Sequence, residues 1–558
     1  MKNFKYLITT ILLAFFGCNE EKFLKEVPLD VYTSEISYNT PEDIVMTITE
    51  MYRYVKYAYN AGFTTNTYMI IGTDVGMSPR NPADQIGYGG GSDINPQSRM
   101  IQYMWGYMYQ VIKNANLVLE KIELVDYASE DLKNAHIAEA RFFRGYAYRT
   151  LANMYGSVPI ILEVLSSPKR DYVRAESRDA VYQQAASDLE FATNNLPTIE
   201  NVEASGRVSK AAAYHILSEV YISLREWDKA IAAAAWVIDN PNFRLMTERF
   251  GRRTDVPETN VFWDLFQKGN VDWQAGNKET IWALQTVYGI PGGSILHYNY
   301  QENFGYEFSF GPLYWFIKDP DGILAILPTT YNGGRTGGAV SPVNHVKYDI
   351  WKGNWDNDIR NAPCNIKREF IVDNPASAYF GQSANIAFPQ GIDNDSLWHR
   401  HPYWMKLTTP GDHPPETIRV PENGLMWGLA GSTYKNWQHI RLAETYLLLA
   451  EAYLGKGDKL NAAGAINVVR NRAGANPVDA TDVDIDYILD ERLRELLFEE
   501  PRRMTLMRLG RWYDRTTRYN QWSSPDKVQE HWELFPIPYS EIERNTGAEL
   551  VQNPGYTN

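Results

Sequence analysis

Two stretches of this chain repeat one pattern of small and large residues, without a gap, over 24 residues and at a separation of 232 positions. The first covers residues 214–237 and the second residues 446–469. Both have small residues where two helices must approach closely and large ones where a groove must be filled. Each stretch is therefore predicted to be a helix, a short turn and a second helix. The matching positions are Tyr214 and Tyr446, Leu217 and Leu449, Ser218 and Ala450, Tyr221 and Tyr453, Ala230 and Ala462, Ala234 and Ile466, and Val237 and Val469.

Two more copies of the helix pair are expected once insertions are allowed. Residues 148–155 match the first helix and 185–192 the second, with a polar excursion between them. Residues 45–52 match a first helix again, and residues 115–122 its partner, after a long loop. The pattern resembles the tetratricopeptide repeat, and about four copies exceed the roughly three that bury a continuous core. We therefore predict a mostly α fold, a helical repeat scaffold in which two repeats are split by insertions.

The middle of the chain, residues 243–433, differs from this scaffold. It holds 20 of the 39 glycines and 9 of the 16 tryptophans, and glycine-rich loops such as 331–339 are frequent there. Loops on a rigid scaffold commonly carry binding sites, so we interpret this part as an irregular, aromatic-rich, ligand-binding elaboration. The expected organisation is a signal peptide (1–17), an N-terminal helical part with inserted loops (18–242), the elaboration (243–433), and a C-terminal repeat with its following segment (434–558).

The first residues have the features of a targeting signal. Lys2 and Lys5 precede an apolar run of 11 residues, 6–16, which is followed by Gly17 and Cys18. Eleven residues are too few to cross a bilayer core, which takes about 20, and the pattern is typical of a secretory signal peptide. A small residue before a cysteine resembles the bacterial lipoprotein box, so we expect Cys18 to be the site of lipid attachment. The alternative is a signal peptide cut elsewhere, with Cys18 incidental.

Composition narrows the class of ligand. The net charge of −14 is a poor match for nucleic acid, whose affinity for proteins depends on neutralising phosphates. The chain has 37 tyrosines and 16 tryptophans, whose apolar rings with a polar group suit a wet binding surface. No cofactor is expected, since the glycine-rich stretch 88–93 lacks the Lys and Ser or Thr of a phosphate-binding loop. We therefore set nucleic acid aside as a partner and favour a small ligand.

Stretches along nearly the whole chain resemble the SusD/RagB family of outer-membrane nutrient-binding lipoproteins. They are the segment 23–43, the helix at 138–161, the last repeat at 439–454 and 465–475, the Arg/Glu-rich segment 490–511 and the C-terminal segment 535–556. Two positions depart from the family pattern. Pro501 stands where the family often has Gly, so the helix should break before Arg502, and Asn545-Thr546 replaces a usual Asn-Pro.

The resemblance implies a function and a location. A member of this family is lipid-anchored in the outer membrane and faces the cell exterior. There it binds oligosaccharides, or other nutrients, and delivers them to a partner TonB-dependent transporter barrel of the SusC type. It is not an enzyme. The resemblance also implies that the repeat helices face the transporter, while the ligand lies on a shallow aromatic surface built from inserted loops.

Two loops offer the residue types that a sugar needs. A sugar stacks its C–H face on flat aromatic rings, and its hydroxyls pair with planar donors and acceptors. Loops 72–95 and 286–315 supply both, and the second follows a strand-like alternation at 279–285. We expect part of this set to be structural. The candidate ligand-binding residues are Asp74, Arg80, Asn81, Tyr88, Tyr288, His297, Tyr298, Tyr300, Tyr306 and Trp315.

Rival functions stay open at this point. A tetratricopeptide-type scaffold for a peptide or protein would use a concave repeat surface and needs no aromatic lid. A surface glycoside hydrolase needs a carboxylic acid of raised pKa in an enclosed cleft, and no motif provides one. His399, His401 and His413 form the only histidine cluster, but no zinc signature surrounds them, so no metal site is expected.

The Arg/Glu-rich segment 490–511 is interpreted as structural. Glu491, Glu495 and Glu499 interleave with arginines at helical spacing. Such spacing predicts ion pairs between residues three and four apart on one helix.

Overall fold

The protein is mostly helical, with short strands, in the computed structural model that describes residues 38–59, 66–86, 94–165, 170–298, 300–388 and 398–557. The expected signal peptide, Cys18 and Tyr88 lie outside the described residues. Over the described ranges, no helix combines the length and apolar character that crossing a membrane requires.

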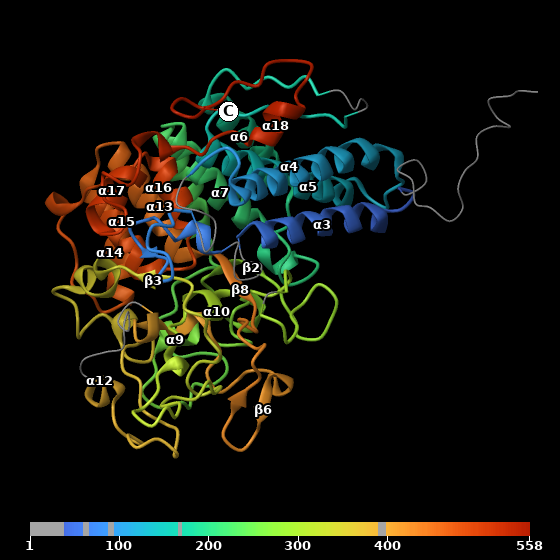
Figure 1. Ribbon diagram of the computed structural model, residues 1–558. Helices are drawn as coiled ribbons and strands as arrows, with labels where there is room; N and C mark the ends of the chain where they lie inside the picture. The colour runs from blue at the N-terminus through green and yellow to red at the C-terminus, as the bar shows by residue number, and fades with distance from the viewer. Residues whose placement is uncertain are drawn as a thin grey trace, which may run out of the picture.

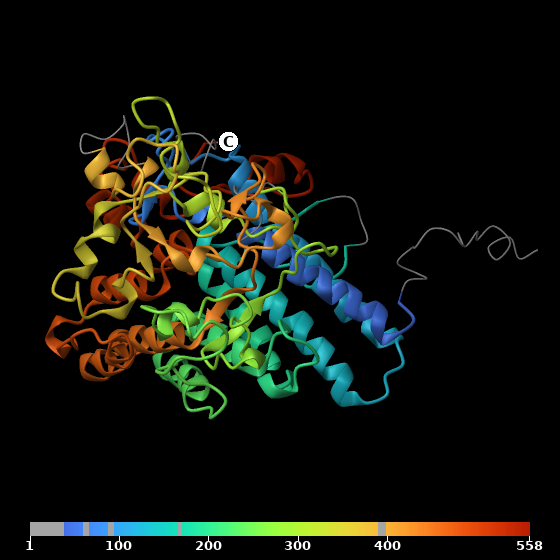
Figure 2. The same cartoon turned by 90° about the horizontal axis from the view of Figure 1, so that it is seen from below.

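The helices of all four expected pairs are present, and each packs on its partner. Successive pairs also contact one another, and α8 packs on α13 although the two are far apart in sequence. Figures 1 and 2 both show α3, α4 and α5 running side by side. The prediction of a mostly α fold built on paired helices is confirmed. The pairs are α3 (Pro41–Tyr59) with α4 (Arg99–Lys121), α5 (Glu130–Tyr155) with α6 (Arg178–Asn195), α7 (Lys210–Ser223) with α8 (Trp227–Ile238), and α13 (Leu442–Gly455) with α14 (Lys459–Arg472).

Small residues allow the helices to pack this closely. A Cβ added to Gly145 on α5 would lie 2.9 Å from the side chain of Leu189 on α6. A Cβ added to Gly455 on α13 would lie 2.5 Å from the ring of Trp227 on α8. Both distances are too short for a side chain, so these contacts require glycine. The small positions of the sequence pattern are likewise in the interior, since Ser218, Ala230, Ala450 and Ala462 are fully buried.

The C-terminal segment continues the helical body with α15 (Ile485–Leu496), α16 (Arg502–Leu509), α17 (Trp512–Tyr519) and α18 (Tyr539–Arg544). The expected break is confirmed, because α15 ends before Pro501 and α16 begins directly after it. Of the ion pairs expected within one helix, Glu491 with Arg494 is present at 2.8 Å.

The two buried carboxylates of α15, Glu491 and Glu495, pair mainly with arginines from other elements. Glu495 accepts hydrogen bonds from Arg360 at 2.8 Å, from Arg441 at 2.5 Å, and from Arg472. All four side chains are at most 1% exposed. These charges therefore tie the loop-rich part and α14 to α15, which local spacing did not predict.

One strand pair joins the loop-rich part to the helical body. β2 (Thr280–Leu284) pairs antiparallel with β8 (Trp437–Arg441), so that Leu284 lies opposite Trp437. This confirms the strand expected at 279–285. The chain therefore leaves the helical body and returns to it at adjacent points.

The described residues of the loop-rich part, in the lower half of Figure 1, form only short elements. Its glycines and turns leave little room for longer ones. β1 pairs with β3, β4 with β5, and β6 with β7. The elements are α9 (Val261–Asp264), α10 (Tyr306–Phe310), α11 (Asn344–Lys347) and α12 (Ala384–Ala387), with β3 (Ser341–Pro342), β4 (Ile366–Lys367), β5 (Tyr403–Trp404), β6 (Ile418–Val420) and β7 (Leu425–Met426), while β1 (Gly76–Met77) comes from the N-terminal part.

Candidate ligand-binding surface

The short helix α10 is held in place by a buried carboxylate. Glu307, fully buried, accepts hydrogen bonds from Thr408 Oγ1 at 2.7 Å and from His413 Nε2 at 2.8 Å. The next residue of α10, Phe308, is half-buried at the protein surface. Because charge-assisted hydrogen bonds are strong and directional, Glu307 fixes the backbone that presents Phe308.

Three rings surround a guanidinium group, and we name Tyr298, Phe308, Trp315 and Arg335 the aromatic platform. Tyr298 stacks on Phe308 with ring centres 4.2 Å apart and planes 4° apart. The indole of Trp315 is fixed because its N–H donates to the carbonyl oxygen of Thr336 at 2.8 Å. The Cζ of Arg335 lies 4.8 Å from the ring centre of Trp315, 5.6 Å from that of Tyr298 and 5.9 Å from that of Phe308. All four side chains are half-buried.

Arg335 carries a charge that no other described residue neutralises. Within the described ranges its guanidinium has neither an ion pair nor a hydrogen bond, and its Nη1 is shielded from solvent without a partner. Burial lowers the pKa of Arg335 from its ordinary value, yet a guanidinium stays charged at neutral pH. The platform therefore has a positive centre.

Trp398 extends the platform toward the loop that carries Arg80. The backbone N–H of Leu313 donates to the carbonyl oxygen of Trp398 at 2.8 Å, two residues before Trp315. The indole of Trp398 packs against Gly338, where an added Cβ would lie 2.4 Å from its Cδ1. The Cζ of Arg80 lies 5.2 Å from the Trp398 ring centre. The two loops predicted to bind ligand thus meet at one surface.

The structure therefore brings together part of the predicted set. His297, Tyr298 and Trp315 share one segment, and Arg80 joins them through Trp398. His297 is exposed and stacks on Tyr298 with ring centres 5.3 Å apart.

Asp74 and Tyr306 lie in the interior instead, and this corrects their expected placement at the surface. The fully buried carboxylate of Asp74 accepts hydrogen bonds from Arg502 at 2.9 and 2.6 Å and from Arg515 at 2.7 Å. Burial alone would raise the pKa of Asp74, but the two guanidinium groups outweigh it and hold that pKa well below its usual range. Tyr306 is 4% exposed and stacks on Trp437 at 3.8 Å. Both residues therefore stabilise the fold.

The remaining predicted residues have other neighbours. Asn81 is exposed and donates to Asp84 Oδ1 at 2.7 Å within its own turn. Tyr288 meets Tyr434 edge-on with ring centres 5.7 Å apart. Tyr300 is 37% exposed. Their part in ligand binding stays a prediction, as it does for Tyr88, which lies outside the described residues.

Trp355, an exposed tryptophan outside the platform, offers a contrast to Trp315. Trp355 is 43% exposed, and the Cζ of Arg368 lies 4.6 Å from its ring centre. Arg368 donates to the side-chain oxygen of Asn361 at 2.7 Å and to the carbonyl oxygens of Asn361 and Lys347. That guanidinium is therefore engaged by the fold, unlike the one in the platform.

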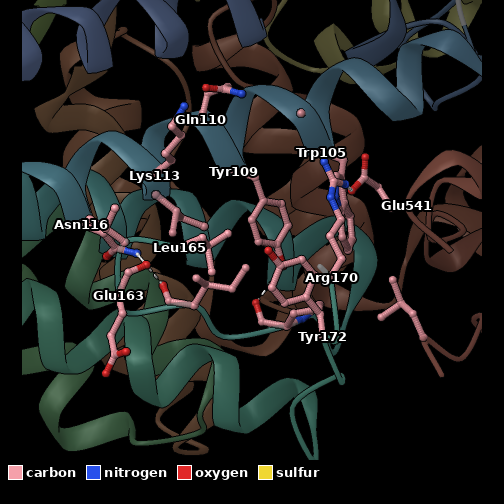
Figure 3. A pocket seen from close by; sticks show the side chains of 16 residues that line it. Trp105, Tyr109, Gln110, Lys113, Asn116, Glu163, Leu165, Arg170, Tyr172 and Glu541 are labelled. Carbon is pink, nitrogen blue, oxygen red and sulfur yellow. Dashed lines mark hydrogen bonds and ion pairs between the residues drawn. The ribbon is translucent and has the colours of Figure 1, made fainter. Parts of the chain in front are cut away.

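A hollow of about 540 Å³ lies on the helical body, between α4, the excursion after α5 and the C-terminal segment (Figure 3). Trp105 and Tyr109 of α4 line it, and Tyr109 donates to the carbonyl oxygen of Pro159 at 2.8 Å. Two of the charged residues that line it, Arg170 and Glu541, form an ion pair at 2.8 Å. It adjoins α18, which lies at the opposite end of Figure 1 from the loop-rich part.

The three histidines that are clustered in the sequence have different surroundings in the structure. His413 binds Glu307, His399 stacks on Trp398, and burial lowers the pKa of His401 to about 3. In the part of the chain that the structure describes, no group of three or more His, Cys, Asp or Glu side chains is placed to hold a metal ion.

Sequence reasoning missed Phe308, Arg335 and Trp398. Arg335 had a signal, because it is the one charged residue in the glycine-rich stretch 331–339. Phe308 lay inside the predicted loop 286–315 but had no feature that set it apart. Trp398 had no local signal, since its contact with Gly338 depends on the fold.

These features define a class of protein, a body of paired helices that carries a loop-built aromatic surface for a ligand. Residues 22–222 match a family described as starch-binding and associating with the outer membrane, and residues 422–556 match the SusD family. The chain belongs to the SusD/RagB family.

Relatives and solved structures agree with this assignment. A SusD-like protein of Formosa agariphila is 23% identical over 97% of this chain and 96% of its own length. A SusD-like protein of Bacteroides ovatus is 24% identical over 95% of this chain and 85% of its own length. The fold matches a laminarin-binding SusD-like protein with a TM-score of 0.65, 22% identity and coverage of 93% and 100% of the two chains. It also matches surface glycan-binding protein A of Bacteroides thetaiotaomicron, solved with laminarihexaose, with a TM-score of 0.65, 18% identity and coverage of 92% and 100%.

Proposed function

We propose that this protein binds oligosaccharides at the cell surface on the aromatic platform. The observation that carries the proposal is the grouping of half-buried Tyr298 and Trp315 around the guanidinium of Arg335, which no described residue pairs. Rings of this kind take the C–H face of a sugar, while guanidinium N–H groups donate to its oxygens. The solved structures named for laminarin and laminarihexaose support a glycan as the class of ligand.

We further propose that the chain is a lipoprotein of the outer membrane, that it faces the cell exterior, and that it delivers its ligand to a TonB-dependent transporter of the SusC type. The family description, with its association with the outer membrane, supports this location. So does the apolar run before Cys18. The proposed contact with the transporter is on the paired helices, because the platform occupies the loop-rich part. Catalysis is not part of the proposed function.

The platform is tested with two matched tryptophan variants. Trp315→Ala should weaken glycan binding about five- to twelvefold, since losing one stacking ring costs on the order of 1–1.5 kcal/mol. Trp355→Ala also removes a tryptophan ring that lies next to an arginine, but outside the platform, and should leave glycan binding unchanged. Titration calorimetry over a panel of neutral and acidic polysaccharides measures both. Equal binding by the wild type and Trp315→Ala would contradict the proposed site.

The partner and the anchor need separate experiments. A tagged full-length chain, purified from membranes in mild detergent, should bring down a large β-barrel in near-equal amount, and recovery of the chain alone would count against delivery. Cys18→Ala should release the chain from the membrane fraction when no partner is present. Incubation with the bound glycan should release no new reducing ends.

A second candidate function is that of a scaffold for a protein partner, and the hollow of Figure 3 favours it. That hollow lies on the paired helices and includes Leu165, which is 56% exposed. Leu165→Asp should weaken a protein complex but leave glycan binding unchanged. Loss of glycan binding in this variant would move the ligand site to the hollow.

A further inference from the structure

We infer that the platform selects glycans that carry an acidic group, a uronate carboxylate or a sulfate ester, and that Arg335 binds this group. The inference rests on the proposed glycan-binding function and deepens it. Its basis is the positive charge of the Arg335 guanidinium, which forms no ion pair with any described residue.

Three other arginines have the oxygen acceptors that Arg335 lacks among the described residues. Arg360 meets Asp358 and two glutamates, and Arg502 meets Asp74. Arg368, which also lies over a tryptophan, is engaged by three oxygen acceptors. The guanidinium of Arg335 differs from these three, because its only contacts with described residues are with aromatic rings.

Glu307 is a candidate counter-charge for Arg335, but one of its carboxylate oxygens is already hydrogen-bonded to two other residues. Glu307 precedes Phe308 on α10, but its carboxylate binds Thr408 and His413 and forms no ion pair with Arg335. A half-buried charge without a partner is costly, because the surrounding rings replace water without supplying an acceptor. An anion brought by the ligand would remove this cost, so the platform should bind acidic glycans more tightly than neutral ones.

The guanidinium of Arg335 suits a planar carboxylate, with two oxygens, or a tetrahedral sulfate ester, with three terminal oxygens. The rings of Trp315, Tyr298 and Phe308 cover part of the guanidinium, and Nη1 is shielded from solvent. A ligand would therefore meet the remaining N–H donors, on Nε and Nη2. A guanidinium presents these donors as a fork that matches the oxygens of a carboxylate or a sulfate. A sugar stacked on Trp315 would then place an acidic substituent within reach of Arg335, 4.8 Å from the same ring.

The overall charge of −14 does not oppose this contact. Exposed charges are largely screened beyond about 8 Å at physiological salt, whereas a half-buried contact is screened much less. The local guanidinium therefore decides the preference, and Arg80 on Trp398 adds a second positive group to the same surface.

The experiment compares each acidic glycan with its neutral counterpart. Oligogalacturonate is paired with its carboxyl-reduced form, and a sulfated galactan with its desulfated form, in calorimetric titrations at 0.15 M salt. The wild type should bind the acidic member of at least one pair about tenfold more tightly, the effect of one charge-assisted hydrogen bond. A preference within the galacturonate pair would indicate a carboxylate, and one within the galactan pair a sulfate.

Three variants connect that preference to Arg335. Arg335→Met keeps the apolar stem over the rings and should abolish the preference while it retains binding of the neutral member. Arg335→Lys keeps the charge without the fork and should retain part of the preference. Arg252→Met removes an equal charge at a 59% exposed site in the loop-rich part and should behave as the wild type. The thermal midpoint of Arg335→Met should not fall, because the variant removes an uncompensated charge.

The outcomes separate this inference from the proposed function. Equal binding of acidic and neutral members by the wild type, with both lost in Trp315→Ala, would overturn the acidic preference and leave glycan binding in place. A preference that persists in both Arg335→Met and Arg335→Lys would also overturn the role of Arg335. Binding of no glycan in the panel would contradict the proposed function and the inference together.

Discussion

Replacing Asp74 by asparagine should destabilise the fold and leave ligand binding unchanged. The buried carboxylate accepts three hydrogen bonds, two from Arg502 on α16 and one from Arg515 on α17. It connects the N-terminal loop 72–86 to the C-terminal helices. Asp74→Asn keeps the volume but removes the counter-charge, so two buried guanidinium groups lose a charged partner.

The size of the effect follows from these contacts. Removing one partner of a buried ion pair costs about 3–5 kcal/mol, and we take ~4 kcal/mol because asparagine retains one acceptor. At about 2.1 cal/mol/K of unfolding entropy per residue, the 558 residues contribute about 1.2 kcal/mol/K. The thermal midpoint should therefore fall by about 3–4 °C when the chain unfolds as one unit.

The same ion pair predicts a dependence on pH. The pKa of Asp74 is lower in the folded than in the unfolded protein. Its contribution to the unfolding free energy is therefore complete above about pH 4, the ordinary range of a carboxyl group, and is lost as the pH falls through the lower folded-state pKa. The difference in midpoint between the wild type and Asp74→Asn should be full at pH 7 and should shrink in acid below about pH 4.

Circular dichroism melts at pH 7 and pH 3, with glycan titrations at pH 7, measure these effects. Asp514→Asn is the matched control, since Asp514 is 43% exposed and also accepts two hydrogen bonds from an arginine, Arg518, at 2.9 Å. An exposed pair is worth less than about 1 kcal/mol, so the control should shift the midpoint by no more than about 1 °C. Equal midpoints for Asp74→Asn and the wild type would refute the reasoning. Lost glycan binding at an unchanged midpoint would return Asp74 to the ligand surface.

Three further substitutions test other parts of the structure. Glu495→Gln leaves three buried arginines without a shared counter-charge, so unfolding in denaturant should show a loss of about 3–5 kcal/mol. Burial lowers the pKa of Lys435 to about 7. Because the unfolded chain then holds more protons between about pH 7 and pH 10, wild-type stability relative to Lys435→Met should rise over that range, and a constant difference in midpoint would contradict the lowered pKa. Gly338→Ala puts a Cβ 2.4 Å from Trp398, in backbone with φ +59°, and should weaken glycan binding several-fold at a cost of about 1 kcal/mol in stability; unchanged titrations would exclude Trp398 from the site.

The helical body was predictable because its signals are local. The pattern around residues 214–237 and 446–469 reports which helix faces meet, and Gly455 against Trp227 shows such a contact directly. Pro501 prevents one helix from running unbroken through residues 485–509, wherever the rest of the chain lies. The partners of Glu495 were not predictable, because its arginines come from three separate elements.

The proposed binding surface was predictable only in part, because some of its contacts join residues far apart in the sequence. Tyr298 and Trp315 belong to a loop whose composition alone indicates exposed rings. Asp74 has the same kind of loop neighbours, yet Arg502, 428 positions away, draws it into the interior. Arg335 has no carboxylate partner among the described residues, and such an arrangement exists only in three dimensions.

The adjacent strands β2 and β8 make residues 285–436 a segment whose two ends are already together. A segment of this kind can be transplanted between related helical bodies, because neither its length nor its internal path alters the positions where it is joined. Buried ion pairs set one of the conditions for such a transplant. Arg360 and Lys406 come from this segment and hold the buried acids Glu495 and Glu499 of the helical body. A donor segment that changes the sugar specificity must therefore bring a cation to each of these two places.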